Sequence, residues 1–167
     1  DEAIRHAVAA DEMTWGAQLI EQHVDERILR GEGATLARWL AMLPVGLISA
    51  RPRLCLAQAF VAVAESDVDA AGPALDAAEC ALGCAAEESF ESSAGPASSF
   101  LVNVPAAIAL ERAVLAHLCG DGENTAVFAS RALAATGKGE QMLESLARWY
   151  LAVAEWLRGH LAAAEGA

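Results

Sequence analysis

The sequence predicts an all-α fold in which tetratricopeptide-like helical hairpins stack into a right-handed superhelix. Apolar residues make up 55% of the 167-residue chain. Because many of them are alanine and β-branched runs are few, helix is favoured over sheet. Residues 106–119 and 123–136 both show helical apolar periodicity and are joined by a short polar turn. One such hairpin cannot bury its apolar face alone, whereas stacked neighbours share a continuous core.

The turn of this hairpin is Gly120-Asp121-Gly122. Glycine adopts backbone conformations that other residues resist, so Gly120 and Gly122 suit a tight reversal of the chain. We expect Asp121 to cap the second helix by accepting hydrogen bonds from its first backbone N–H groups.

The same turn recurs, since Asp11, Asp67 and His160 each follow an alanine-rich helix and align with Asp121. The spacings between these turns exceed the standard repeat of about 34 residues, so the repeat is divergent. Small residues at fixed offsets from the turns would let paired helices approach closely. Eight residues before the turns lie Ala3, Ala59, Ala113 and Ala152; four after lie Trp15, Ala71, Thr125 and Ala164; eleven after lie Gln22, Ala78 and Ala132.

The elements ahead of this hairpin carry their own start and stop signals. Residues 2–10 are expected to be the back half of a first helix, and a second runs from position 12 or 14 to Leu29. Thr35 is expected to cap the next helix, TLARWLAML, in which Trp39 is a packing anchor and Pro44 ends the element.

The middle of the chain is marked by prolines and by a long polar stretch. Pro52 suits the first turn of a helix, where its missing N–H is not needed. Pro73 lies inside a helical pattern and is tolerated only near the helix start, because further along it produces a kink. Residues 85–103 are rich in Ser, Glu and Gly and predict a long loop, which would be a binding segment, a lid or a mobile linker. A last long helix is expected over 140–158.

Composition bounds the class of protein. By length we expect a single domain over residues 1–167, as a piece of a larger protein. The formal net charge of −12 and the single lysine argue against nucleic-acid binding by this segment. The longest apolar run is too short to span a membrane. Four cysteines without a matching zinc-ligand pattern are expected to be buried free thiols in a reducing cytoplasm: Cys55, Cys80, Cys84 and Cys119.

Four phrases occur in one order along the chain: TLARWLAMLP, ARPRLCLAQAF, ERAVLAHLCGDGENTAVFASRAL and ARWYLAVAEWLRGHLAAAEGA. Together they resemble the superhelical sensor region of the large ATP-dependent LuxR-type transcriptional regulators, the MalT-like group. The 85–103 loop is longer than this resemblance leads us to expect. The resemblance implies that the segment binds a small inducer or an inhibitory partner protein and relays its state to a nucleotide-hydrolysing domain and a DNA-reading domain, neither of which is in this sequence.

The alternative is a plain tetratricopeptide-like protein–protein scaffold with no small-molecule ligand. An enzymatic role is not expected, since the four histidines lie on different helices or turns and no catalytic motif is present. No cofactor or metal is expected either. Solenoid repeats need polar caps at their ends, and we expect this piece to have none. We therefore expect it to self-associate through a terminal helix, as a homodimer.

The ligand or partner groove is expected on the first helix of each hairpin, which lines the concave face of such stacks. The candidate residues are Arg53, Phe60, His117, Trp149 and Trp156, with Leu56, Val63, Leu110, Val114, Leu146 and Val153 between them. Trp149 and Trp156 are seven residues apart, about two helical turns, and so face one way. The alternative is that both rings pack as core between hairpins.

Overall fold

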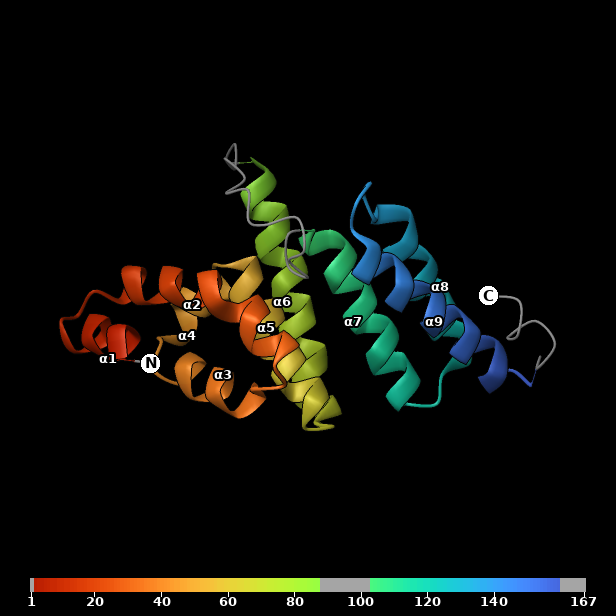
Figure 1. Ribbon diagram of the computed structural model, residues 1–167, viewed down its shortest axis with the longest axis horizontal. Helices are drawn as coiled ribbons and strands as arrows, with labels where there is room; N and C mark the ends of the chain where they lie inside the picture. Colours follow the sequence, from red (N-terminus) through yellow and green to blue (C-terminus); the bar gives the residue numbers. More distant parts are fainter. Residues whose placement is uncertain (1, 88–102, 160–167) are drawn as a thin grey trace.

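The computed structural model describes residues 2–87 and 103–159, and these residues form helices and turns without a strand. The helices are α1 (Glu2–Ala9), α2 (Met13–Leu29), α3 (Gly33–Leu40), α4 (Val45–Ser49), α5 (Pro52–Ala64), α6 (Val68–Glu87), α7 (Val104–Leu118), α8 (Gly122–Ala135) and α9 (Gln141–Leu157). They follow one another along the long axis, so that α1 and α9 lie at opposite ends (Figure 1). The prediction of an all-α chain is confirmed.

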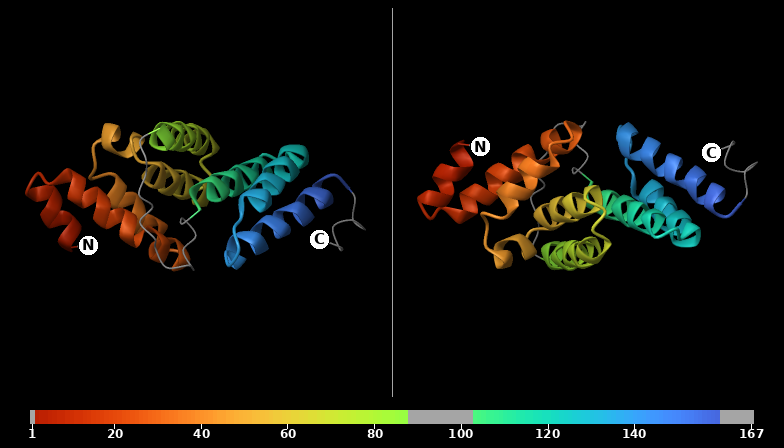
Figure 2. Two further views of the ribbon diagram at one scale, coloured as in Figure 1. Left: turned by 90° about the horizontal axis from the view of Figure 1, so that it is seen from above. Right: turned by 90° about the horizontal axis from the view of Figure 1, so that it is seen from below.

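Helices that are close in sequence are also the ones that pack together. The pairs α5–α6 and α7–α8 form antiparallel hairpins, and α9 packs on α8 and α7. α5 connects the two parts of the stack, because it touches α2 and α3 on one side and α7 on the other. The views from above and below show the same succession (Figure 2). The core is therefore continuous and lies between successive helix pairs.

Five helices end in a residue with a left-handed backbone conformation, the feature that sets the repeat register. These residues are Asp11, Gly31, Ser66, Gly120 and Gly159, with φ between 59° and 78°. After the first four, the next backbone N–H donates to the carbonyl five residues back, as in Asp67 to Ala62 (2.8 Å) and Asp121 to Ala116 (2.9 Å). This is the Schellman arrangement, which satisfies carbonyls at the end of one helix and reverses the chain.

At the first four of these turns, the residue after the left-handed one directly precedes the next helix. Asp121 accepts a hydrogen bond from the Asn124 N–H (3.0 Å), which confirms its predicted cap, and Asp67 accepts one from the Ala70 N–H (3.1 Å). Glu12 holds this place ahead of α2, whereas Asp11 is the left-handed residue. The first turn therefore aligns with the others on Glu12, and the predicted alignment on Asp11 is wrong by one position.

The expected small residues are buried in two hairpins and not in the first. Where α5 meets α6 and α7 meets α8, the six aligned side chains are at most 2% exposed: Ala59, Ala71, Ala78, Ala113, Thr125 and Ala132. In the first hairpin Ala3 and Gln22 are exposed and Trp15 is 47% exposed. The register shifted by one residue instead places the buried Ile4 and Gly16 at the first two offsets.

Two element boundaries near α3 differ from expectation. α3 begins at Gly33, so Thr35 lies in its first turn and is not its cap; Glu32 holds that place without a side-chain cap. The five-residue helix α4, which follows Pro44, was not predicted. A helix this short has too little periodicity to be seen in sequence.

The prolines of the middle segment behave differently from each other. Pro52 is the first residue of α5, as predicted. Pro73 is the sixth residue of α6 and lies inside the helix. Because α6 continues to Glu87, residues 85–87 are helical and were wrongly included in the loop. The rest of that loop, up to residue 102, lies outside the described residues, as do His160 and Ala164.

The burial predicted for the cysteines is right for one of the four. Cys55 is 1% exposed and its thiol donates to the Ile48 carbonyl at 3.1 Å. Cys80, Cys84 and Cys119 are free thiols and exposed. Cys80 and Cys84 lie on α6, and Cys119 is the residue that follows the last residue of α7. Within the described ranges, no helix is both long and apolar enough to cross a membrane.

Candidate functional site

The start of α9 is fixed to both α7 and α8 by Asn103. The Asn103 side chain caps α7 by accepting from the Ala106 N–H at 3.1 Å. Its amide nitrogen donates to the Ala135 carbonyl at the end of α8 (2.7 Å) and to Glu140, which precedes α9 (2.9 Å). Glu140 also accepts from the Gly137 N–H at 2.7 Å. One asparagine thus joins three helix ends and sets the position of α9.

The other end of α9 is fixed by close approach to α8. A Cβ atom on Gly122 would lie 3.0 Å from the Leu157 Cβ and 3.2 Å from the Ala154 carbonyl oxygen. Gly122 does not have a positive φ, so it serves this close contact and not the turn conformation that was predicted. Arg158 adds an ion pair to Glu123 at 2.8 Å. α9 is therefore held at both ends while its outer face stays open.

That outer face carries two exposed indole rings. Trp149 is 54% exposed and Trp156 is 58% exposed, so the alternative in which both rings are core does not describe the structure. Tyr150 is partly buried and meets the Trp149 ring edge-to-face, with centroids 4.6 Å apart, and the His117 ring of α7, with centroids 5.9 Å apart. We call Trp149, Tyr150, Trp156 and His117 the α9 aromatic surface. It contains three of the five predicted site residues.

Beneath this surface lies a buried acid that was not predicted as a site residue. Glu111 of α7 is 3% exposed, and its Oε2 atom has no hydrogen-bond partner among the described residues. Burial raises the pKa of the Glu111 carboxyl to about 7. Burial, and secondly the charge of Glu111, raise the pKa of the Tyr150 hydroxyl. The sequence signal was a carboxylate within the apolar stripe AIALERAVLA.

His117 contributes a second polar atom beside Tyr150. Its Nδ1 atom is buried and has no hydrogen-bond partner within the part of the chain that the structure describes. An imidazole nitrogen accepts or donates a hydrogen bond according to its tautomer. The α9 aromatic surface thus combines large apolar rings with a polar group, as protein interaction sites do.

The other predicted groove residues do not join this surface. Arg53 of α5 forms an ion pair with Asp25 of α2 at 3.2 Å, so its charge holds two helices together. Phe60 is partly buried on α5, which packs against α7. Leu56 and Leu110 are 0% and 1% exposed and belong to the core, so their assignment to an open groove is wrong. These two helices are not free along the stack, because α5 packs against α7 and α7 packs against α9.

Comparison with protein-family models, with curated proteins and with solved structures gave no match to this chain. In the described residues no group of three or more His, Cys, Asp or Glu side chains is arranged to hold a metal ion. A function can therefore be proposed only from the motifs of the chain, from its fold and from the geometry of α7 and α9.

Proposed function

We propose that this chain is the effector-sensing, protein-interaction region of a LuxR-type transcriptional regulator of the MalT-like group. In this proposal its hairpins form part of a tetratricopeptide-like superhelix in the cytoplasm. It binds a small inducer or an inhibitory partner protein and passes its state to NTPase and DNA-binding domains outside this sequence. It is not an enzyme and does not itself bind nucleic acid.

The observation that carries this proposal is the exposure of Trp149 and Trp156 on one face of α9. Tryptophan and tyrosine are enriched where proteins meet partners, because each gives a large apolar contact with little loss of rotamer freedom. The support network at Asn103 and Gly122 holds α9 in place without covering these rings. We therefore assign the α9 aromatic surface to a protein partner.

The ordered set of phrases and the repeated hairpin turns support the family part of the proposal. Four turns share the Schellman geometry, and two successive hairpins share buried small residues in one register, as stacked repeats require. The net charge of −12 supports the assignment of DNA binding to another part of the regulator, since phosphate contacts need clustered Lys and Arg.

The sequence that flanks this chain in its gene tests the family assignment. We expect a phosphate-binding loop of the form G-x-x-x-x-G-K-[ST] upstream and a helix-turn-helix downstream. Flanking sequence that lacks both would remove the regulator assignment and leave the plain scaffold. A thermal shift with a pool of small metabolites then separates the two kinds of effector, because ligand binding raises the unfolding temperature by mass action.

A further inference from the structure

The rings of the α9 aromatic surface are inclined to one another and in part open to solvent. The planes of Trp149 and Tyr150 meet at 77°, and those of His117 and Tyr150 at 60°. Trp149 is 54% exposed, and Trp156, about two helical turns further along the same face of α9, is 58% exposed. The face of an aromatic ring has a negative electrostatic potential and attracts a cation placed over it. The exposed indoles therefore offer a place for positive charge.

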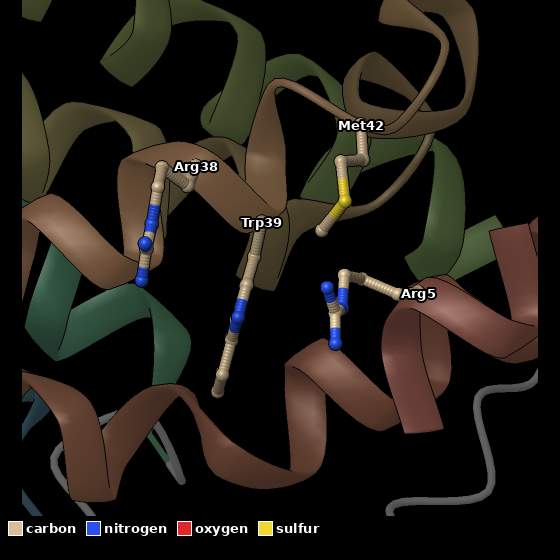
Figure 3. A pocket seen from close by; sticks show the side chains of 4 residues that line it. All are labelled: Arg5, Arg38, Trp39 and Met42. Carbon is tan, nitrogen blue, oxygen red and sulfur yellow. The ribbon is translucent and has the colours of Figure 1, made fainter. Parts of the chain in front are cut away.

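Other rings of the chain already have one of its own cations beside them. Arg27 lies 5.3 Å from the centroid of the Trp39 ring, which is 3% exposed. Arg112 and Arg131 lie 5.9 Å and 5.8 Å from the centroid of the Phe128 ring. Figure 3 shows Trp39 beside a cavity of about 300 Å³, whose lining residues are Arg5, Arg38, Trp39 and Met42.

Among the described residues, no cation lies over a ring of α9. The two arginines nearest to these rings in sequence are held by carboxylates. Arg148 pairs with Glu144 at 3.0 Å, and Arg158 pairs with Glu155 at 3.0 Å and with Glu123 at 2.8 Å. The whole chain has 23 Asp and Glu residues against 11 Lys and Arg. A cation for the rings of α9 is therefore expected from a partner.

A buried negative charge acts on the same surface. The Glu111 carboxyl of α7 is 3% exposed, and its Oε2 atom has no hydrogen-bond partner among the described residues. After burial, the charge of Glu111 is the second cause that raises the pKa of the Tyr150 hydroxyl, so this charge reaches α9. An unpaired buried carboxylate is destabilising, and an approaching cation offsets part of this cost. The rings and the carboxylate thus favour positive charge at the same place.

We infer that the α9 aromatic surface receives an arginine side chain of its protein partner, which lies against the exposed Trp149 indole and whose charge is matched by the Glu111 carboxylate. This inference rests on the proposed function, since it names the chemistry of the partner that meets this surface. A guanidinium group suits the place because it stacks on aromatic faces and is more weakly hydrated than an ammonium group. A cationic partner also complements the net charge of −12.

The test is a nuclear magnetic resonance titration of the 167-residue chain with three short peptides. The peptides share the same leucine residues and differ only at two positions, which carry arginine, glutamine or glutamate. The titration is run at pH 8, where the Glu111 carboxyl, with a pKa of about 7, is mostly ionised. About 0.15 M salt screens attraction beyond roughly 8 Å, and the chain is kept dilute enough to be a monomer.

We expect saturable shifts of the Trp149 and Trp156 indole N–H groups with the arginine peptide. The glutamine peptide should bind about fivefold more weakly, and the glutamate peptide more weakly still. Trp15 is the internal reference, because its ring is 47% exposed on α2. General attraction of a basic peptide to this acidic chain would shift the Trp15 indole N–H to the same extent, whereas a site on α9 leaves it unchanged.

Two variants separate the contributions of the ring and of the carboxylate. Trp149→Leu keeps an apolar side chain but removes the ring, so the arginine peptide should then bind about as weakly as the glutamine peptide, with the Trp156 N–H as the readout. Glu111→Gln should weaken binding of the arginine peptide by at least about threefold and leave the glutamine peptide unchanged, because only a charged ligand senses the lost charge. Trp15→Leu is the matched control and should bind all three peptides as the parent does.

Four results would overturn the inference: no saturable shift with the arginine peptide, equal binding of the glutamine peptide, equal shifts at Trp15, or an unchanged ratio of the two affinities in Trp149→Leu. Equal binding of the glutamine peptide would leave the α9 aromatic surface as an apolar protein contact, so the inference would fail while the proposed function stands. Flanking sequence that lacks both regulator domains would remove the proposed function without changing this titration, so the two failures are distinguishable.

Discussion

Glu111→Gln is expected to stabilise the chain by about 3 kcal/mol at pH 8 and by less than about 1 kcal/mol at pH 5. The Glu111 carboxyl has a pKa raised from 4.5 to about 7 by burial. Between these two values the folded chain binds a proton that the unfolded chain releases, so the free energy of unfolding falls as pH rises through this window. Above about pH 7 the penalty is constant, and below about pH 4.5 it is absent.

Unfolding in urea at the two pH values measures this effect. The control is Glu65→Gln. Glu65 is exposed at the end of α5, so this variant should show the same pH dependence of unfolding free energy as the parent. Removing the charge at position 111 should also lower the pKa of Tyr150, because that charge helps to raise it. A Glu111→Gln variant with the same loss of stability from pH 5 to pH 8 as the parent would contradict the burial of an unpaired carboxylate.

Trp39→Ala is expected to cost roughly 3–5 kcal/mol of unfolding free energy, whereas Trp156→Ala should cost less than about 1 kcal/mol. Trp39 is 3% exposed in the core, while Trp156 is 58% exposed on α9. Trp149→Ala should fall between them, at about 1 kcal/mol, because its ring meets Tyr150 edge-to-face. The three variants are compared by denaturant unfolding at low protein concentration, where association does not add to stability.

Quenching by acrylamide provides an independent measure of the same difference. The parent chain should show a strongly quenched fraction of tryptophan fluorescence, and Trp156→Ala should reduce that fraction while Trp39→Phe does not. A loss of roughly 3 kcal/mol or more in Trp156→Ala, at the level expected for a core ring, would place this ring in the core and remove the α9 aromatic surface as a site.

Local turn chemistry is the part of the fold that the sequence revealed best. The cap at Asp121 and the helices on each side of it follow from residues within one turn of each other. The first turn was misaligned because Asp11 and Glu12 are adjacent acidic residues, and only the backbone shows that Asp11 takes the left-handed position. Aspartate suits both places, so its identity does not distinguish them.

The candidate site could be predicted only where one helix determined it. The spacing of Trp149 and Trp156 places both on one face of α9, and the structure leaves that face open. The burial of Leu56 and Leu110 depends on the hairpin that packs next to them, which helical periodicity does not contain. Likewise Arg53 was assigned to a groove because its sequence neighbours do not reveal its partner. That partner, Asp25, lies 28 residues earlier in the chain, on α2.

Glu111 and its neighbour Arg112 show the same limit most clearly. The two charged residues are adjacent in sequence. Arg112 nevertheless forms ion pairs with Asp76 and Glu79 of α6, whereas Glu111 is buried. In sequence both are interruptions of an apolar stripe. Which of the two is buried without a partner is decided by the packing of α7 in the stack.

The central claim is that the outer face of α9 is a contact surface, and the molar mass of the chain in solution tests it most directly. The exposed indoles of Trp149 and Trp156 should drive association of two copies of this isolated chain, because burying such apolar area is favourable. Light scattering should therefore give the mass of a dimer for the parent and of a monomer for Trp149→Ser/Trp156→Ser. A clean monomer for the parent at high concentration, or a dimer that persists in the double variant, would contradict the claim.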